Sequence, residues 1–300
     1  MTKVNNKKLE RLINKAWYTD DKKKASELAR QILEISPENT EALLILADNF
    51  DENDDSAREE LLLRTLKSID DENNNYSDEV KESFYISVHF RLAYTFFSLR
   101  KFNETLSSCQ EVFRLLEVSE NNDLIEFDIE DDLKALQYRS LIELERWHEI
   151  LSMTMKDETH GLAWAYSRLI AAWKTAPAEQ VLALCASMFW DALIIAPNVP
   201  FYILGYYEEP DDDESEDFVF SVLFSGIMSI SEKFYHWFTR GTILFGLLTN
   251  RFDGKEREYL LDVLDSLGGY EEYEKMNSLV LEADDNSVIE LLAANKCLRQ

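Results

Sequence analysis

The stretch that decides the fold is residues 9–37, LERLINKAWYTDDKKKASELARQILEISP. Its apolar residues recur every three or four positions in two runs, which is the period of one helix face. The first run is Leu9, Leu12, Ile13 and Ala16, and the second is Ala25, Leu28, Ala29, Ile32 and Leu33. The polar turn Thr19-Asp20-Asp21 separates the runs, and the second ends at Pro37 because proline cannot continue a helix. We therefore predict a helix–turn–helix unit of about 34 residues, a length typical of helical repeat proteins.

Units of similar length follow along the chain. The second covers residues 40–71, the third has a first helix that begins near Ser77, the fourth covers residues 131–155, and the fifth covers residues 159–197. One hairpin cannot bury both of its faces, so neighbouring hairpins must stack, and small residues such as Ala47 and Ala93 let them approach closely. Glycine and proline are scarce, with 8 and 5 residues, which favours long helices over a β fold. The predicted fold is all-α.

The first unit resembles the tetratricopeptide repeat family, whose pattern asks for apolar residues at fixed places and for proline near the end of each repeat. The matching residues, in order, are Leu9, Leu12, Ala16, Ala25, Ala29, Ile32 and Pro37. The resemblance implies a helical-hairpin solenoid of about five helix pairs over residues 1–197.

Residues 198–300 differ from the repeats, and we predict that they form a helical region that caps the stack. The segment 197–205, PNVPFYILG, precedes an acidic turn, an aromatic helix with Trp237, and Gly241. This order is similar to a segment of uncharacterised bacterial tetratricopeptide proteins and of the eukaryotic suppressor-of-tumorigenicity-seven family. The resemblance implies an interaction protein and brings no catalytic residues with it.

The helices of the capping region are predicted from the same periodicity. Two of them cover residues 218–229 and 231–248. The remainder, residues 255–300, is predicted as three short helices interrupted at Gly268-Gly269 and Asp284-Asp285.

The charge balance limits the class of partner. The chain has 31 Lys and Arg against 58 Asp and Glu, a formal net charge of −27. Nucleic-acid binding requires cations that neutralise phosphates, so we expect no nucleic-acid partner, and an anionic membrane surface is disfavoured for the same reason. Residues 1–30 are the exception, with nine Lys and Arg against four Asp and Glu. We interpret this basic hairpin as a solvated surface, with a docking site for an acidic partner as the alternative, while the acidic remainder could attract a basic partner.

The sequence also predicts a location. The N-terminus lacks the apolar stretch of a signal peptide. Residues 181–205 contain Asp191 as their one charge, but Pro197 and Pro200 interrupt them, and the helix before Pro197 is shorter than the ~20 residues that span a bilayer. We therefore expect no membrane span and a cytoplasmic protein.

No constellation of residues in the sequence points to catalysis. Cys109, Cys185 and Cys297 are far apart, which predicts neither a disulfide framework nor a metal site. The four histidines stand outside metal-binding motifs, and phosphate-binding glycine loops and nucleophile elbows are missing. The acidic run Glu208–Glu214 lacks the glycine of a calcium loop, so we interpret it as a solvated turn. We expect no enzymatic activity, no metal and no cofactor.

A candidate binding surface follows from the family resemblance, since the first helix of each tetratricopeptide hairpin lines the concave surface of the stack. The partner-binding candidates are Asn14, Trp17, Asp48, Phe90, Arg91, Tyr94 and Phe97, and Glu10, Glu41 and Leu44 occupy neighbouring places. Aromatic anchors beside an arginine and carboxylates suit an extended or helical peptide. The alternative for each residue is that it belongs to the solvated side of its helix.

The leading hypothesis is a cytoplasmic, non-enzymatic scaffold or adaptor that holds a protein or peptide in this groove. A peptide-sensing regulator, in which ligand binding tightens the stack, is the alternative. A third hypothesis is an acidic inhibitor that mimics nucleic acid, which would require a regular stripe of carboxylates, whereas the acidic residues cluster in the predicted turns.

Overall fold

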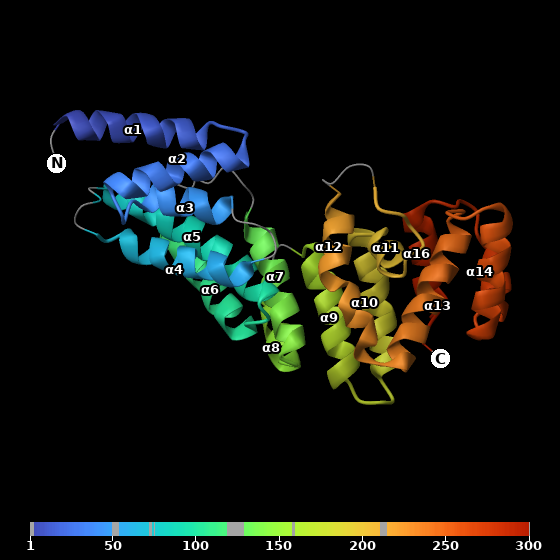
Figure 1. The fold of residues 1–300 in the computed structure, drawn as a ribbon. Helices are drawn as coiled ribbons and strands as arrows, with labels where there is room; N and C mark the ends of the chain where they lie inside the picture. Colours follow the sequence, from blue (N-terminus) through green and yellow to red (C-terminus); the bar gives the residue numbers. More distant parts are fainter. Residues whose placement is uncertain are drawn as a thin grey trace. The chain divides into compact units, whose positions relative to one another are not determined.

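The computed structural model describes residues 3–49, 54–71, 74, 76–118, 129–157, 160–210 and 215–299. Every regular element within these ranges is a helix: there are sixteen α-helices, α1 to α16, and one 3₁₀-helix. The all-α prediction is confirmed. By its internal contacts the chain divides into two compact units, Met1–Ser140 and Leu141–Gln300 (Figure 1).

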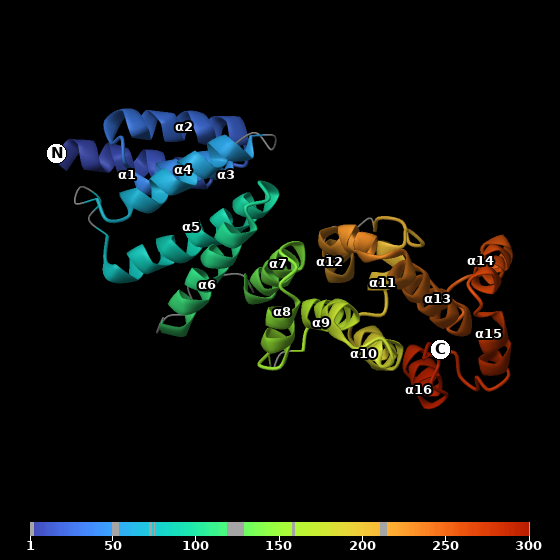
Figure 2. The same ribbon diagram turned by 90° about the horizontal axis from the view of Figure 1, so that it is seen from below.

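The first unit contains six complete helices and most of a seventh. They are α1 (Lys3–Trp17), α2 (Lys22–Ile35), α3 (Thr40–Asp48), α4 (Asp55–Ser68), α5 (Asp78–Ser98), α6 (Phe102–Val118) and α7 (Ile129–Glu143), which ends in the second unit. From α1 to α6, each helix packs against the next one along the chain (Figures 1 and 2). Neighbouring helices are thus paired in chain order, while their assembly into a tetratricopeptide superhelix stays a prediction.

Polar N-cap residues begin four of these helices. Asp21 accepts hydrogen bonds from the backbone N–H groups of Lys23 and Lys24, Asn39 from that of Ala42, Asp54 from that of Ala57, and Ser77 from that of Val80. Such caps satisfy N–H groups that have no partner inside the helix. The predicted turn at Asp20-Asp21 and the predicted helix start near Ser77 are both confirmed.

The core of the first unit depends on α3, which buries residues on two of its sides. Ala42 and Ile45 belong to a cluster with α1 and α2, and Leu44 and Ala47 belong to a cluster with α4 and α5. All four are at most 2% exposed. The expectation that Leu44 faces the groove is therefore wrong. Burial on two sides is what stacking of successive hairpins requires.

The second unit continues from the end of α7. Its described helices are α8 (Trp147–Thr154), α9 (Leu162–Thr175), α10 (Val181–Ile195), α11 (Val199–Ile203), α12 (Glu216–Phe224), a 3₁₀-helix (Ser225–Ile230), α13 (Glu232–Leu248), α14 (Gly254–Ser266), α15 (Tyr270–Asn277) and α16 (Asp285–Ala294). α8, α9 and α10 pack in chain order, and α16 returns to pack on both α10 and α13. α13 is the most deeply buried of these helices, with every residue from Gly241 to Leu248 in the core.

Most helices predicted for residues 198–300 are confirmed, including the three short ones at the end. The sequence analysis does not predict α11, because Pro197 and Pro200 indicate an interruption between helices. In the structure Pro200 lies in the first turn of α11, where proline is tolerated. The predicted boundary at residue 197 falls inside the second unit. The division into repeats over 1–197 and a cap over 198–300 stays a prediction. In the acidic run Glu208–Glu214, residues 211–214 lie outside the described part of the chain.

The segment 197–205 serves the packing of the second unit. Phe201 is fully buried, and the guanidinium of Arg251 lies 5.1 Å from the centre of its ring. The same guanidinium donates hydrogen bonds to Asn198 Oδ1 at 2.7 Å and to Asp285 Oδ2 at 2.6 Å. Arg251 therefore ties this segment to the turn after α13 and to the first turn of α16.

Gly246→Ala should destabilise the second unit. A Cβ atom at Gly246 would lie 2.5 Å from Phe252 Cε2 and 2.7 Å from Phe201 Cε1, both on buried rings. Overpacking costs about 1–3 kcal/mol, and the better helix propensity of alanine returns at most ~1 kcal/mol. Chemical denaturation should therefore give a lower free energy of unfolding.

The matched control is Gly161→Ala, because no atom lies within 4 Å of the Cβ position at Gly161. Gly161 is the N-cap residue of α9, so this variant should lose at most about 1 kcal/mol, through the poorer cap alone. Equal losses in the two variants would show that close packing at α13 is not the cause.

Candidate partner-binding surface

An aromatic stripe runs along α5. Phe90, Tyr94 and Phe97 are spaced by four and three residues, so they share one face of the helix. The rings of Phe90 and Tyr94 meet edge to face with 5.2 Å between their centres, and Phe97 meets Phe102 of α6 at 5.7 Å. Tyr94 keeps 36% of its surface exposed. Three of the predicted binding residues therefore lie on one face of α5.

The carboxylate of Asp132, in the first turn of α7, lies near the hydroxyl group of Tyr94 and acts on its pKa. Burial of the phenol, together with the negative charge of Asp132, raises the pKa of Tyr94. The phenol therefore keeps its proton and stays neutral at physiological pH, with Asp132 beside it. Sequence analysis misses Asp132, although its place among three acids at the start of a helix is a recognisable signal.

Arg91 and Asp48 form a two-pronged ion pair between α5 and α3. Arg91 Nε lies 2.5 Å from Asp48 Oδ1, and Arg91 Nη2 lies 2.8 Å from Asp48 Oδ2. The remaining nitrogen, Nη1, donates to Ser87 Oγ at 2.6 Å and to the Ser87 carbonyl at 3.1 Å. Sequence analysis treats Arg91 and Asp48 as separate groove residues, but here each neutralises the other. The guanidinium of Arg91 is therefore already bound by Asp48 and Ser87 and is poorly placed to bind a partner's carboxylate.

Trp17 and Glu41 link α1 to α3. The indole Nε1 of Trp17 donates a hydrogen bond to Glu41 Oε2 at 3.0 Å, while 41% of the Trp17 surface stays exposed. Burial raises the pKa of Glu41 above its ordinary value of 4.5, and the hydrogen bond from Trp17 only partly opposes this shift. Asn14 and Glu10 lie on exposed positions of the same helix, in the turns before Trp17.

These contacts connect the odd-numbered helices of the first unit in order. Trp17–Glu41 joins α1 to α3, Asp48–Arg91 joins α3 to α5, and Tyr94–Asp132 joins α5 to α7. We call the surface that carries them the odd-helix face. It presents partly exposed aromatic rings among the carboxylates of Glu41, Asp48 and Asp132. The one cation predicted for this face, Arg91, is paired with Asp48.

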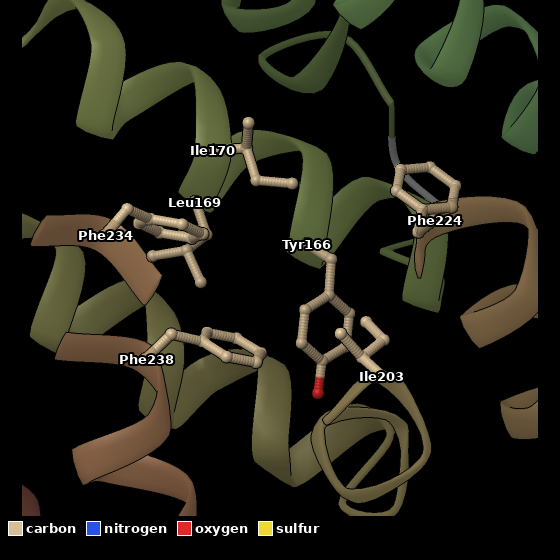
Figure 3. Close-up of a pocket in the computed structure, with 7 residues that line it drawn as sticks. All are labelled: Tyr166, Leu169, Ile170, Ile203, Phe224, Phe234 and Phe238. Carbon is tan, nitrogen blue, oxygen red and sulfur yellow. The ribbon is translucent and has the colours of Figure 1, made fainter. Parts of the chain in front are cut away.

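A small cavity lies in the core of the second unit (Figure 3). Side chains from α9, α11, α12 and α13 surround it, and all but the hydroxyl of Tyr166 are apolar: Tyr166, Leu169, Ile170, Ile203, Phe224, Phe234 and Phe238. That hydroxyl donates a hydrogen bond to the Ala196 carbonyl at 2.8 Å. The cavity volume of about 10 Å³ is close to the minimum for a single water molecule, so the cavity is a packing gap rather than a ligand site.

A wider hollow of about 460 Å³ lies between α2, α3 and α4. Its lining includes Arg30 and Arg64, but Arg64 is held by Glu38, with 2.8 Å between Nη2 and Oε1. Five of its eight described lining residues are polar, Ser26, Arg30, Asn49, Glu60 and Arg64, and none of the eight is a histidine or a cysteine.

The cysteine thiols are poor candidates for nucleophiles. Cys109, Cys185 and Cys297 are buried and unbonded to one another. Burial raises the pKa of each thiol to about 12, so the reactive thiolate is scarce at neutral pH. Among the residues that the structure describes, no three His, Cys, Asp or Glu side chains are grouped so that they could hold a metal ion.

Comparison of this chain with protein-family models, with curated proteins and with solved structures finds no match. The resemblance to tetratricopeptide repeats therefore rests on the sequence pattern and stays a prediction. In the described ranges, no helix combines the length and the apolar character needed to cross a membrane.

Glu41→Gln should raise stability at neutral pH. The pKa of Glu41 is higher in the folded than in the unfolded state, so the folded state is penalised once the carboxyl ionises. Wild type should lose stability relative to the variant as pH rises from the ordinary glutamate pKa through the raised one. The introduced glutamine amide keeps an oxygen that can accept from Trp17, so this hydrogen bond is retained.

The check is urea denaturation of both proteins at several pH values. Below the ordinary pKa of glutamate both side chains are neutral, and the two free energies of unfolding should coincide. A variant that is less stable than wild type at neutral pH would show that the ionised carboxylate is favoured in the fold.

Proposed function

We propose that this chain is a non-enzymatic scaffold that binds a protein or peptide on its odd-helix face. The proposal takes the first unit as the beginning of a tetratricopeptide-like stack, in which the first helices of the hairpins line the binding groove. The chain-order packing of α1 to α6 supports it.

The observation that carries the proposal is the way two exposed aromatic residues are held. Trp17 and Tyr94 each direct the polar end of the ring to a carboxylate of a neighbouring helix, Glu41 and Asp132, while much of the ring surface stays open. Tryptophan and tyrosine are the residue types that most often dominate binding energy at interfaces. Rings fixed in advance lose less conformational entropy when a partner binds.

The charges around these rings indicate the chemistry of the partner. Glu41, Asp48 and Asp132 are acidic, and Arg91 is neutralised by Asp48. The whole chain has a net charge of −27, which attracts cationic partners at long range. We therefore propose a neutral or basic segment as the occupant of the face, and a partner that offers a carboxylate is disfavoured.

We also propose a cytoplasmic location. All three cysteines are free, and proteins of oxidising compartments usually pair theirs.

The test is affinity capture from native lysate with wild type and with the double variant Trp17→Ala/Tyr94→Ala. Wild type should retain a discrete protein at moderate salt. Loss of two anchors, each worth more than about 1 kcal/mol, should reduce the retained protein by at least about tenfold.

The control is Tyr235→Ala/Tyr259→Ala, which removes two exposed aromatic residues of the second unit, 42% and 64% exposed. This variant should retain the protein at the wild-type level. Circular dichroism melting confirms that each variant is folded. Undiminished capture by the folded Trp17→Ala/Tyr94→Ala protein would remove the odd-helix face from the proposal.

A further inference from the structure

A row of cations lies on the exposed side of α1. Lys7, Lys8, Arg11 and Lys15 are all exposed, and we call them the basic face. The opposite side of α1 packs into the core through Ile13 and Ala16 and the partly buried Leu9 and Leu12. Glu10 is the only carboxylate of the helix. α1 lies at the edge of the first unit (Figure 1), and its main contacts are with α2 and α3.

The ion pairing of the basic face differs from that of several other cations in the first unit. Among the described residues, no carboxylate forms an ion pair with any of the four. Elsewhere in the unit, cations are held by acids, as in the pairs Arg64–Glu38, Lys81–Asp70, Arg91–Asp48, Lys101–Glu59 and Arg114–Glu111. The four cations of the basic face therefore lack an ion-pair partner among the described residues, although the chain contains 58 Asp and Glu residues.

This arrangement opposes the stability of α1 itself. Lys7 and Arg11 are four residues apart, as are Arg11 and Lys15, and like charges at this spacing repel each other on a helix. The first turn of α1 contains no acidic residue, although the positive end of the helix dipole favours acids there. A surface that served only solubility in an acidic protein would need neither feature. An anionic partner would relieve both.

We propose that the basic face of α1 is a docking site for an acidic peptide segment of another protein. From Lys7 to Lys15 the face extends about 12 Å, which matches two turns of a helix or a short extended segment with carboxylates at regular spacing. Tyr18, which is 87% exposed, directly follows the helix and offers an aromatic contact at the end of the charged row. The site is separate from the odd-helix face, so it does not depend on the scaffold proposal.

Charge complementarity favours a peptide over a long polyanion. Residues 1–30 carry about five positive charges in excess, since they contain nine Lys and Arg and four Asp and Glu, against a total of −27. A short acidic segment engages the basic face alone. A nucleic acid or an anionic bilayer extends over a larger area and meets the repulsion of the remaining acidic surface.

The experiment measures fluorescence anisotropy of labelled decaglutamate with the full chain at about 20 mM and about 150 mM NaCl, because screening should weaken contacts between exposed charges. Wild type should bind, more tightly at low salt. Arg11→Glu/Lys15→Glu should weaken binding by at least about tenfold. The matched control is Lys233→Glu/Lys255→Glu, which lowers the net charge equally by changing two exposed lysines of the second unit, and it should bind nearly as wild type does.

A folding readout accompanies the binding measurement. Arg11→Glu alone places a carboxylate four residues from both Lys7 and Lys15, so it should not lower the melting temperature, while it should still weaken decaglutamate binding. Absence of decaglutamate binding by wild type, or equal weakening in the matched control, overturns the proposal. Tighter binding of single-stranded DNA or of phosphatidylserine vesicles through the same residues would also overturn it, since the occupant would then be a polyanion of another class.

Discussion

The burial of α3 on two sides is the constraint on which the first unit depends. A nine-residue helix places Ala42 and Ile45 against the first hairpin, and Leu44 and Ala47 against α4 and α5. Alanine at two of these four positions lets the neighbouring backbones approach, while the larger side chains supply most of the apolar area removed from water. This contact places α4 and α5 on the side of α3 opposite the first hairpin, because the hairpins cannot bury their apolar faces alone.

Fixing the helix order also fixes which side chains face each other. The odd-numbered helices come close enough for Trp17 to reach Glu41, for Arg91 to reach Asp48, and for Tyr94 to reach Asp132. Two of these contacts, those of Trp17 and Tyr94, leave aromatic surface exposed. The proposed binding face therefore shares residues with the packing between helices, and burial raises the pKa of Glu41 there because it disfavours the ionised carboxylate.

The sequence predicts the helices well because helix period, polar caps and prolines are local signals. Ser77 and Asp21 begin helices where the pattern indicates, and the three short C-terminal helices are found as expected. The side-chain partnerships are not local. Asp48 and Arg91 are 43 residues apart, so no periodicity reveals that they neutralise each other. Repeat matching also places Leu44 on a groove, whereas packing against two hairpins draws it into the core.

The most direct test of the binding face is site-specific photocrosslinking. A photoreactive phenylalanine analogue replaces Tyr94 in one protein and the exposed Tyr259 of the second unit in another, and both are irradiated in native extract. The account predicts one discrete crosslinked protein from position 94 and none from position 259. Equal adducts from both positions, or an adduct from position 259 alone, would contradict it.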